Sequence, residues 1–183
     1  MKVCIVGAGA IGGYMAVRIA NAGHDVSVIA RGPHLAAIKA RGMKLIEEND
    51  EFVAENLTAT EFVGELGPMD VVLLALKAHQ IAPLVNDMSV LLGPNTVIVT
   101  LQNGIPWWYF QNFGGDYANR VVESVDPGGV LSKSIDPERL IGCIAYPATI
   151  ISKPGVIKHI EGNRFPVGEL NGVKSERVQM VSD

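Results

Sequence analysis

Residues 2–13 read KVCIVGAGAIGG, a stretch that combines a strand pattern with a glycine-rich turn. The apolar run Lys2–Val6 has the length and composition of a buried strand, and it stops abruptly at Gly7. Apolar residues then recur at helical spacing until Gly23, and a second apolar run follows at Val26–Ala30. The order of strand, glycine-rich turn, helix and strand predicts a βαβ unit.

The glycines of the turn have the spacing Gly7-x-Gly9-x-x-Gly12, which is the dinucleotide-binding fingerprint. In that fingerprint the first glycine permits a tight turn, the second lets the backbone approach a pyrophosphate, and the third lets the helix pack on the strand. The helix N-terminus also offers free N–H groups to phosphates. A merely structural turn is the alternative. We expect a cofactor to contact the loop and the first helical turn: Gly7, Ala8, Gly9, Ala10, Ile11 and Gly12.

The residue at the end of the second predicted strand is Arg31. An acidic residue at this place binds the ribose 2′-hydroxyl of NAD, whereas an arginine accommodates the 2′-phosphate of NADP. Asp25 is the only nearby acid, and it precedes the strand, at the opposite edge of the sheet. The sequence therefore favours NADP over NAD, with a solvent-exposed surface arginine as the alternative.

Further along the chain, Val71–Leu76 and Thr96–Leu101 are apolar runs typical of strands that a parallel sheet buries on both faces. We predict an α/β, Rossmann-type, doubly wound and mainly parallel sheet. The other expected elements are a helix with Pro33 in its first turn, a hairpin within Met43–Thr60, a helix at residues 81–92, and three strands, Arg139–Ile151, Val156–Glu161 and Arg164–Val167, that close one edge of the sheet.

Two polar residues follow neighbouring strands at their carboxyl ends, where open α/β sheets bind ligands. Lys77 could meet a phosphate or a substrate carboxylate, and the amide of Asn103 could bond the nicotinamide ribose or the substrate. A solvent-facing lysine and an ordinary Asn-Gly turn are equally compatible with the pattern. The four histidines show no catalytic or metal-ligand spacing and are expected to be surface residues.

Composition excludes several classes of function. The net charge is −4 without a block of Lys or Arg, which gives no basis for binding nucleic acid or an anionic membrane. No apolar run approaches the roughly 20 residues of a membrane helix, and we expect a soluble, cytoplasmic protein. Cys4 and Cys143 show no metal-binding or redox spacing. None of the four tyrosines is followed four positions later by lysine, which excludes a short-chain dehydrogenase.

Four motifs in order resemble the N-terminal domain of the ketopantoate reductase family: VGAGAIGG at residues 6–13, ARG at 30–32, LKAHQ at 76–80 and LQNGI at 101–105. The resemblance covers nearly the whole chain. It implies that Arg31 binds the 2′-phosphate of NADPH, and that Lys77 and Asn103 line the cleft for cofactor and substrate. It also implies reduction of 2-dehydropantoate, a small 2-oxo acid, to pantoate in pantothenate and coenzyme A biosynthesis.

The resemblance further implies two parts, an NADP-binding domain at residues 1–170 and, at residues 171–183, a linker with the start of the first helix of a C-terminal helical domain. The catalytic lysine of the family lies in that second domain, beyond Asp183, so we assign no catalytic residue. We expect the 183-residue chain alone to bind NADPH but to be inactive as a reductase. A surface left uncovered by the second domain would promote assembly into a homo-oligomer.

Two alternatives remain open. The enzyme could reduce another branched 2-oxo acid, because the substrate-selecting residues of the family lie mostly in the second domain. The chain could instead be a non-catalytic NADP-binding module whose aromatic segment, Trp107–Phe110, docks a partner.

Overall fold

The computed structural model describes residues 1–112 and 114–183, and within them the chain forms two sheets and four α-helices. The main sheet has seven strands in the order β11-β8-β7-β6-β1-β2-β5. Its strands are β1 (Lys2–Val6), β2 (Asp25–Ile29), β5 (Thr58–Thr60), β6 (Met69–Leu74), β7 (Leu92–Thr100), β8 (Leu140–Cys143) and β11 (Val167–Glu169). All neighbours pair in parallel except β11, which is antiparallel to β8. The predicted doubly wound sheet is confirmed.

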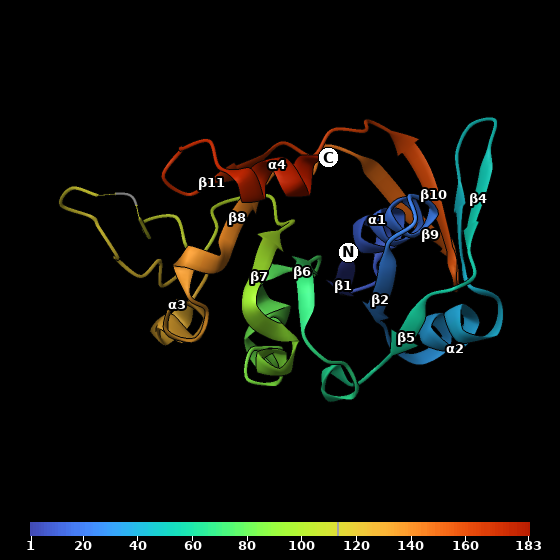
Figure 1. The fold of residues 1–183 in the computed structure, drawn as a ribbon, viewed down its shortest axis with the longest axis horizontal. Coiled ribbons are helices and arrows are strands. Elements are labelled where there is room, and N and C mark those ends of the chain that lie inside the picture. The colour runs from blue at the N-terminus through green and yellow to red at the C-terminus, as the bar shows by residue number, and fades with distance from the viewer. Residues whose placement is uncertain (113) are drawn as a thin grey trace.

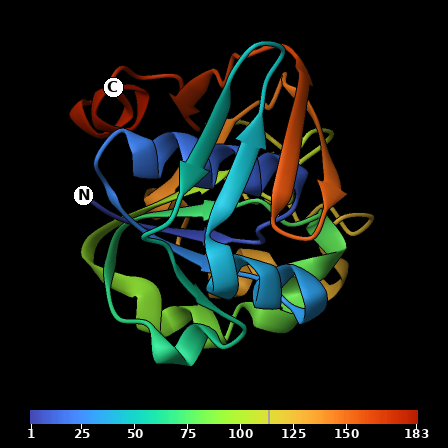
Figure 2. The ribbon, with the colours of Figure 1, turned by 90° about the vertical axis from the view of Figure 1, so that its right-hand side faces the viewer.

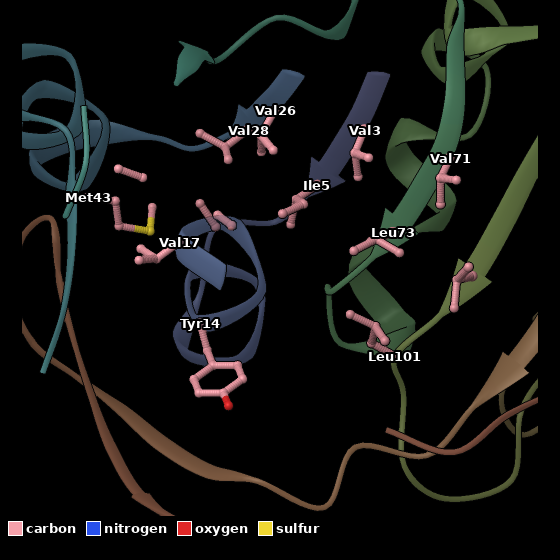
Figure 3. Packing of buried hydrophobic residues seen from close by; sticks show 14 of the residues in the cluster. Val3, Ile5, Tyr14, Val17, Val26, Val28, Met43, Val71, Leu73 and Leu101 are labelled. Carbon is pink, nitrogen blue, oxygen red and sulfur yellow. The ribbon is translucent and has the colours of Figure 1, made fainter. Parts of the chain in front are cut away.

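The central strands are buried on both faces because their side chains alternate between two hydrophobic clusters. Val3 and Ile5 of β1 pack on the face that carries helix α1 (Ala10–Asn21), whereas Cys4 and Val6 pack on the opposite face. Figure 3 shows the first face, where the valines of neighbouring strands line up beside α1. Each strand therefore contributes to both layers of the core.

A second sheet of four strands covers the outer side of α1, in the order β4-β3-β10-β9 (Figures 1 and 2). These strands are β3 (Met43–Ile46), β4 (Glu51–Ala54), β9 (Ala148–Lys153) and β10 (Val156–Glu161). The expected hairpin is confirmed as β3 and β4, which pair antiparallel.

The prediction that three late strands all close one edge of the main sheet was wrong in part. The segment Arg139–Ile151 contains two strands, of which β8 joins the main sheet and β9 leaves it. Strand β10 pairs with β9 and, in parallel, with β3 of the hairpin, so both β9 and β10 belong to the second sheet. Strand β11 (Val167–Glu169) forms the expected edge, but it starts three residues later than the predicted Arg164–Val167.

The predicted continuous helix at residues 81–92 was also wrong. The chain instead forms three short 3₁₀ helices, Ala78–Gln80, Ala82–Leu84 and Asp87–Leu91. Pro83 lies in this stretch and has no N–H to donate to a helix. The apolar stripe nevertheless packs as expected, because Ile81, Met88 and Leu91 are all buried against the second face of the sheet.

The remaining helices are α2 (Gly32–Arg41), α3 (Val130–Ser134) and α4 (Glu176–Ser182). Helix α2 begins with Pro33 in its first turn, as the sequence predicts. Helix α4 is capped by Ser175, whose hydroxyl accepts a hydrogen bond from the N–H of Val178. Val178 also packs against the core, so α4 is docked on the domain.

The carboxylate of Glu169 on β11 links α4 and its capping residue to the main sheet. Glu169 accepts hydrogen bonds from Ser175 Oγ (2.5 Å) and Arg177 Nε (2.6 Å), and it forms an ion pair with Arg177. The Glu169 side chain is only 8% exposed. The hydrogen bond from Arg177 lowers the pKa of Glu169, while burial opposes that shift. The carboxylate is therefore held in its charged form.

We predict that Glu169→Gln lowers the free energy of unfolding by about 1–2 kcal/mol, because the half-buried Arg177 guanidinium loses its charged partner. The depressed pKa means that this stabilisation is present above pH 4.5, the ordinary value for glutamate, and is lost as the pH falls through the folded-state value. Urea unfolding at pH 7 and below pH 4.5 checks this, with Glu161→Gln, on an exposed residue, as control. An equal effect at both pH values would contradict it.

Candidate functional site

A cleft of about 430 Å³ opens at the carboxyl ends of β1, β2 and β6. Strand order reverses between β1 and β6, because the chain runs from β1 to β2 on one side and returns to β6 on the other. Such a switch point is where open α/β sheets bind ligands. Residues Gly7–Gly9 and Leu76 line the cleft, together with Arg31 and His34. None of the described residues that line it is acidic.

The glycine-rich loop is held in place by backbone contacts that require glycine at two positions. Gly7 has φ = +105°, a conformation that favours glycine. A Cβ on Gly12 would lie 2.0 Å from the carbonyl oxygen of Gly7, so α1 approaches the end of β1 as closely as a backbone can. The N–H of Ala8 also donates to the carbonyl of Ile29 (2.9 Å), which joins the loop to β2.

Gly9 differs from these two glycines because neither its backbone conformation nor any neighbouring atom of the described residues requires glycine. Its φ is −69°, and a Cβ built there has no atom within 4 Å. Gly9 is the residue that precedes α1, and the absent side chain leaves open space in front of the helix N-terminus. The first turn of α1 carries no acidic residue and no side-chain cap. Its N–H groups and its dipole therefore favour an anion in this space.

Arg31 lies two residues after the end of β2 and immediately precedes α2, and it lines the cleft together with the loop. It is exposed, and no hydrogen bond or ion pair of its side chain occurs among the residues that the structure describes. Asp25 lies at the other end of β2, where its register partner is Lys2. As the sequence predicts, the charged group at the carboxyl end of β2 is a cation.

Lys77 and Asn103 do not line this cleft. Lys77 follows β6 and is exposed, next to Leu76, which does line it. Asn103 follows β7, and its side-chain amide is already engaged: Nδ2 donates to the carbonyl of Ala145 (2.9 Å) and Oδ1 accepts from the N–H of Ala145 (3.2 Å). Asn103 therefore ties the loop after β7 to the segment after β8.

Two histidines line the cleft, although the sequence indicated only surface residues. His79 is exposed beside Lys77, whereas His34 lies half-buried in the first turn of α2. The sequence offers one signal that His34 lines the cleft: it follows Arg31 by three residues, so the two side chains lie on the same side of the first turn of α2.

The aromatic segment after β7 is divided between the core and the surface. Trp107 is 2% exposed and packs on the second face of the sheet, whereas Tyr109 is 48% exposed. Cys4 and Cys143 are both buried and unpaired, and burial raises the pKa of each thiol to about 12.

The described residues contain no cluster of three or more His, Cys, Asp or Glu side chains that could hold a metal ion. In residues 1–112 and 114–183, no helix has both the length and the apolar character needed to cross a membrane.

Comparison with known proteins gives a consistent family. The profile of the ketopantoate reductase PanE/ApbA family matches residues 3–107. A 2-dehydropantoate 2-reductase of Mesorhizobium japonicum is 48% identical over 184 residues, which cover 100% of this chain and 56% of that protein. One from Pyrococcus abyssi is 31% identical, over 100% of this chain and 52% of that protein.

A solved structure supports the same family. The crystal structure of a candidate ketopantoate reductase from Ralstonia solanacearum MolK2 has a TM-score of 0.92 at 35% identity, covering 98% of this chain and 56% of that one. The chain thus spans about half the length of the relatives it matches. With a family profile matching more than half of its residues, the chain belongs to the ketopantoate reductase family.

Proposed function

We propose that the cleft binds NADPH and that this chain is the cofactor-binding part of a reductase that converts 2-dehydropantoate to pantoate. The observation that carries the proposal is the open space at Gly9, in front of an uncapped helix N-terminus. Such a space fits a pyrophosphate. The substrate is proposed from the names of the relatives, which are 2-dehydropantoate 2-reductases.

Different residues of the cleft would bind different parts of the cofactor. The loop and first turn, Gly7–Gly12, would hold the pyrophosphate, and Arg31 would pair with the 2′-phosphate through its guanidinium fork. The bound nicotinamide would supply the hydride that reduces the ketone. Because Arg31 is the charged residue at the end of β2 and the cleft itself has no acidic lining residue among those described, NADPH is favoured over NADH; Glu61 and Asp87 line the neighbouring pocket on the other side of Arg31.

Lys77 and Asn103 are proposed as ligand-positioning residues on the substrate side of the cofactor. Lys77 is an exposed cation that follows the carboxyl end of β6. Asn103 retains the second N–H of its amide after bonding Ala145, so it can still donate one hydrogen bond to a ligand.

The ketone oxygen of the substrate needs a proton donor when the ketone is reduced. We assign no residue of this chain to that role. We also propose the division of the chain into an NADP-binding domain at residues 1–170 and a connecting segment at 171–183.

We predict that the chain binds NADPH much more tightly than NADH, and that Arg31→Ala raises the Kd for NADPH about tenfold or more. Loss of one charge-assisted, bidentate contact accounts for that factor. Calorimetric titration of both nucleotides tests this. Lys39→Ala, on an exposed residue of α2, is the matched control. Equal affinity of the wild type for both nucleotides would contradict the preference.

Gly9 and Gly12 offer a second test, because the same substitution should act differently at each. Gly9→Ala adds a methyl group to open space, so we expect a change in unfolding free energy of less than about 1 kcal/mol but a severe loss of NADPH binding. Gly12→Ala places its methyl against the Gly7 carbonyl and should lower stability by several kcal/mol, about 3 or more. Thermal unfolding and calorimetry separate the two effects. Undiminished binding by Gly9→Ala would show that the space holds no ligand.

A further inference from the structure

His34 occupies the junction between the cleft and the second sheet. It lies in the first turn of α2 and lines the cleft, and its Nδ1 accepts a hydrogen bond from the N–H of Gly155 (3.1 Å). Gly155 is in the turn between β9 and β10, 121 residues away in sequence. The His34 side chain therefore connects α2 to the second sheet.

The bond to Gly155 fixes the chemical form of the ring. Because Nδ1 accepts a hydrogen bond, it carries no proton, and the neutral ring must carry its proton on Nε2. Burial lowers the pKa of His34, and a contact between the ring and the backbone of Ala8 partly opposes that shift. Nε2 is buried, and among the described residues no acceptor meets the full geometry of a hydrogen bond to it, so the backbone of Ala8 is a near partner and not a fully bonded one. A donor is thus held beside the glycine-rich loop.

The turn that holds Nδ1 is itself firmly anchored. The N–H of Lys44 donates to the carbonyl of Gly155 (2.9 Å), and Arg41 donates to the carbonyl of Pro154 (3.0 Å). A Cβ on Gly155 would lie 3.1 Å from the Cβ of Ala37, so the turn packs closely on α2. The ring of His34 consequently has little freedom to move away from the loop.

We propose that His34 is a positioning residue that joins the glycine-rich loop to the β9–β10 turn, with Nδ1 accepting from Gly155 and the Nε2–H directed at the carbonyl of Ala8. We call these two contacts of His34, with Gly155 and with Ala8, the joint. The inference rests on the proposed function, since the joint would position the loop that holds the pyrophosphate. A pyrophosphate is common to NADPH and NADH. The joint should therefore affect both nucleotides, in contrast to Arg31, which should affect NADPH alone.

Four variants of the full chain test the joint. In His34→Asn the side-chain oxygen can replace Nδ1 as acceptor for Gly155, and in His34→Gln the amide nitrogen can replace Nε2 as donor toward Ala8. His34→Ala and His34→Leu remove both groups, and leucine keeps much of the volume. The measurements are the Kd values for NADPH and NADH, by calorimetry and competition, with thermal unfolding to establish that each variant is folded.

We expect His34→Ala and His34→Leu to weaken NADPH and NADH by the same factor, about fivefold, which is the effect of one ordinary hydrogen bond. His34→Asn and His34→Gln should each recover part of that loss. Wild-type affinity in His34→Leu would overturn the proposal, because packing alone would then suffice. A loss confined to NADPH would also overturn it, because His34 would then act on the 2′-phosphate.

The exchange rate of the Gly155 amide proton tests the joint without any nucleotide. It should be slow in the wild type and in His34→Asn, and faster in His34→Gln and His34→Leu. An amide equally protected in all four proteins would overturn the joint. Wild-type protein that binds neither nucleotide but shows the expected exchange pattern would overturn the proposed function and leave the joint standing.

Discussion

The contact between Gly12 and the carbonyl of Gly7 is the constraint on which the rest of the site depends. A side chain at Gly12 would lie 2.0 Å from that oxygen, so only glycine allows α1 to start directly over the end of β1. The next residue, Gly13, lies on the other side of the helix, close to side chains of the second sheet. A Cβ there would lie 2.7 Å from the side chain of Ile157 and 2.9 Å from that of Met43, so these side chains would have to move. Two successive glycines thus let one helix pack between two sheets.

This arrangement determines what the cleft can bind. Since α1 is held from both sides, its uncapped N-terminus opens into the space that Gly9 leaves free. The partial positive charge of the helix and the free guanidinium of Arg31 then lie on the same cleft, and none of its described lining residues is acidic. A ligand with two separated anionic groups complements such a site, which is the chemical character of a dinucleotide that carries a 2′-phosphate.

Local features of the fold were predictable from the sequence, and long-range pairings were not. The loop, α1, α2 and the central strands follow from apolar periodicity and from single residues such as Gly7 and Pro33. The second sheet could not be predicted, because β10 pairs with β3 more than 100 residues earlier in the chain. The same reason applies to His34, whose partner Gly155 is distant in sequence. The 3₁₀ turns near Pro83 were missed because their apolar spacing is that of a helix.

A crystal structure of this chain grown with saturating NADP would show where each phosphate of the nucleotide lies. We expect the pyrophosphate in the space beside Gly9, at the N-terminus of α1, and the 2′-phosphate against the guanidinium of Arg31. Density for the nucleotide with its 2′-phosphate away from Arg31, or bound outside this cleft, would contradict the assignment of this cleft as the NADP site.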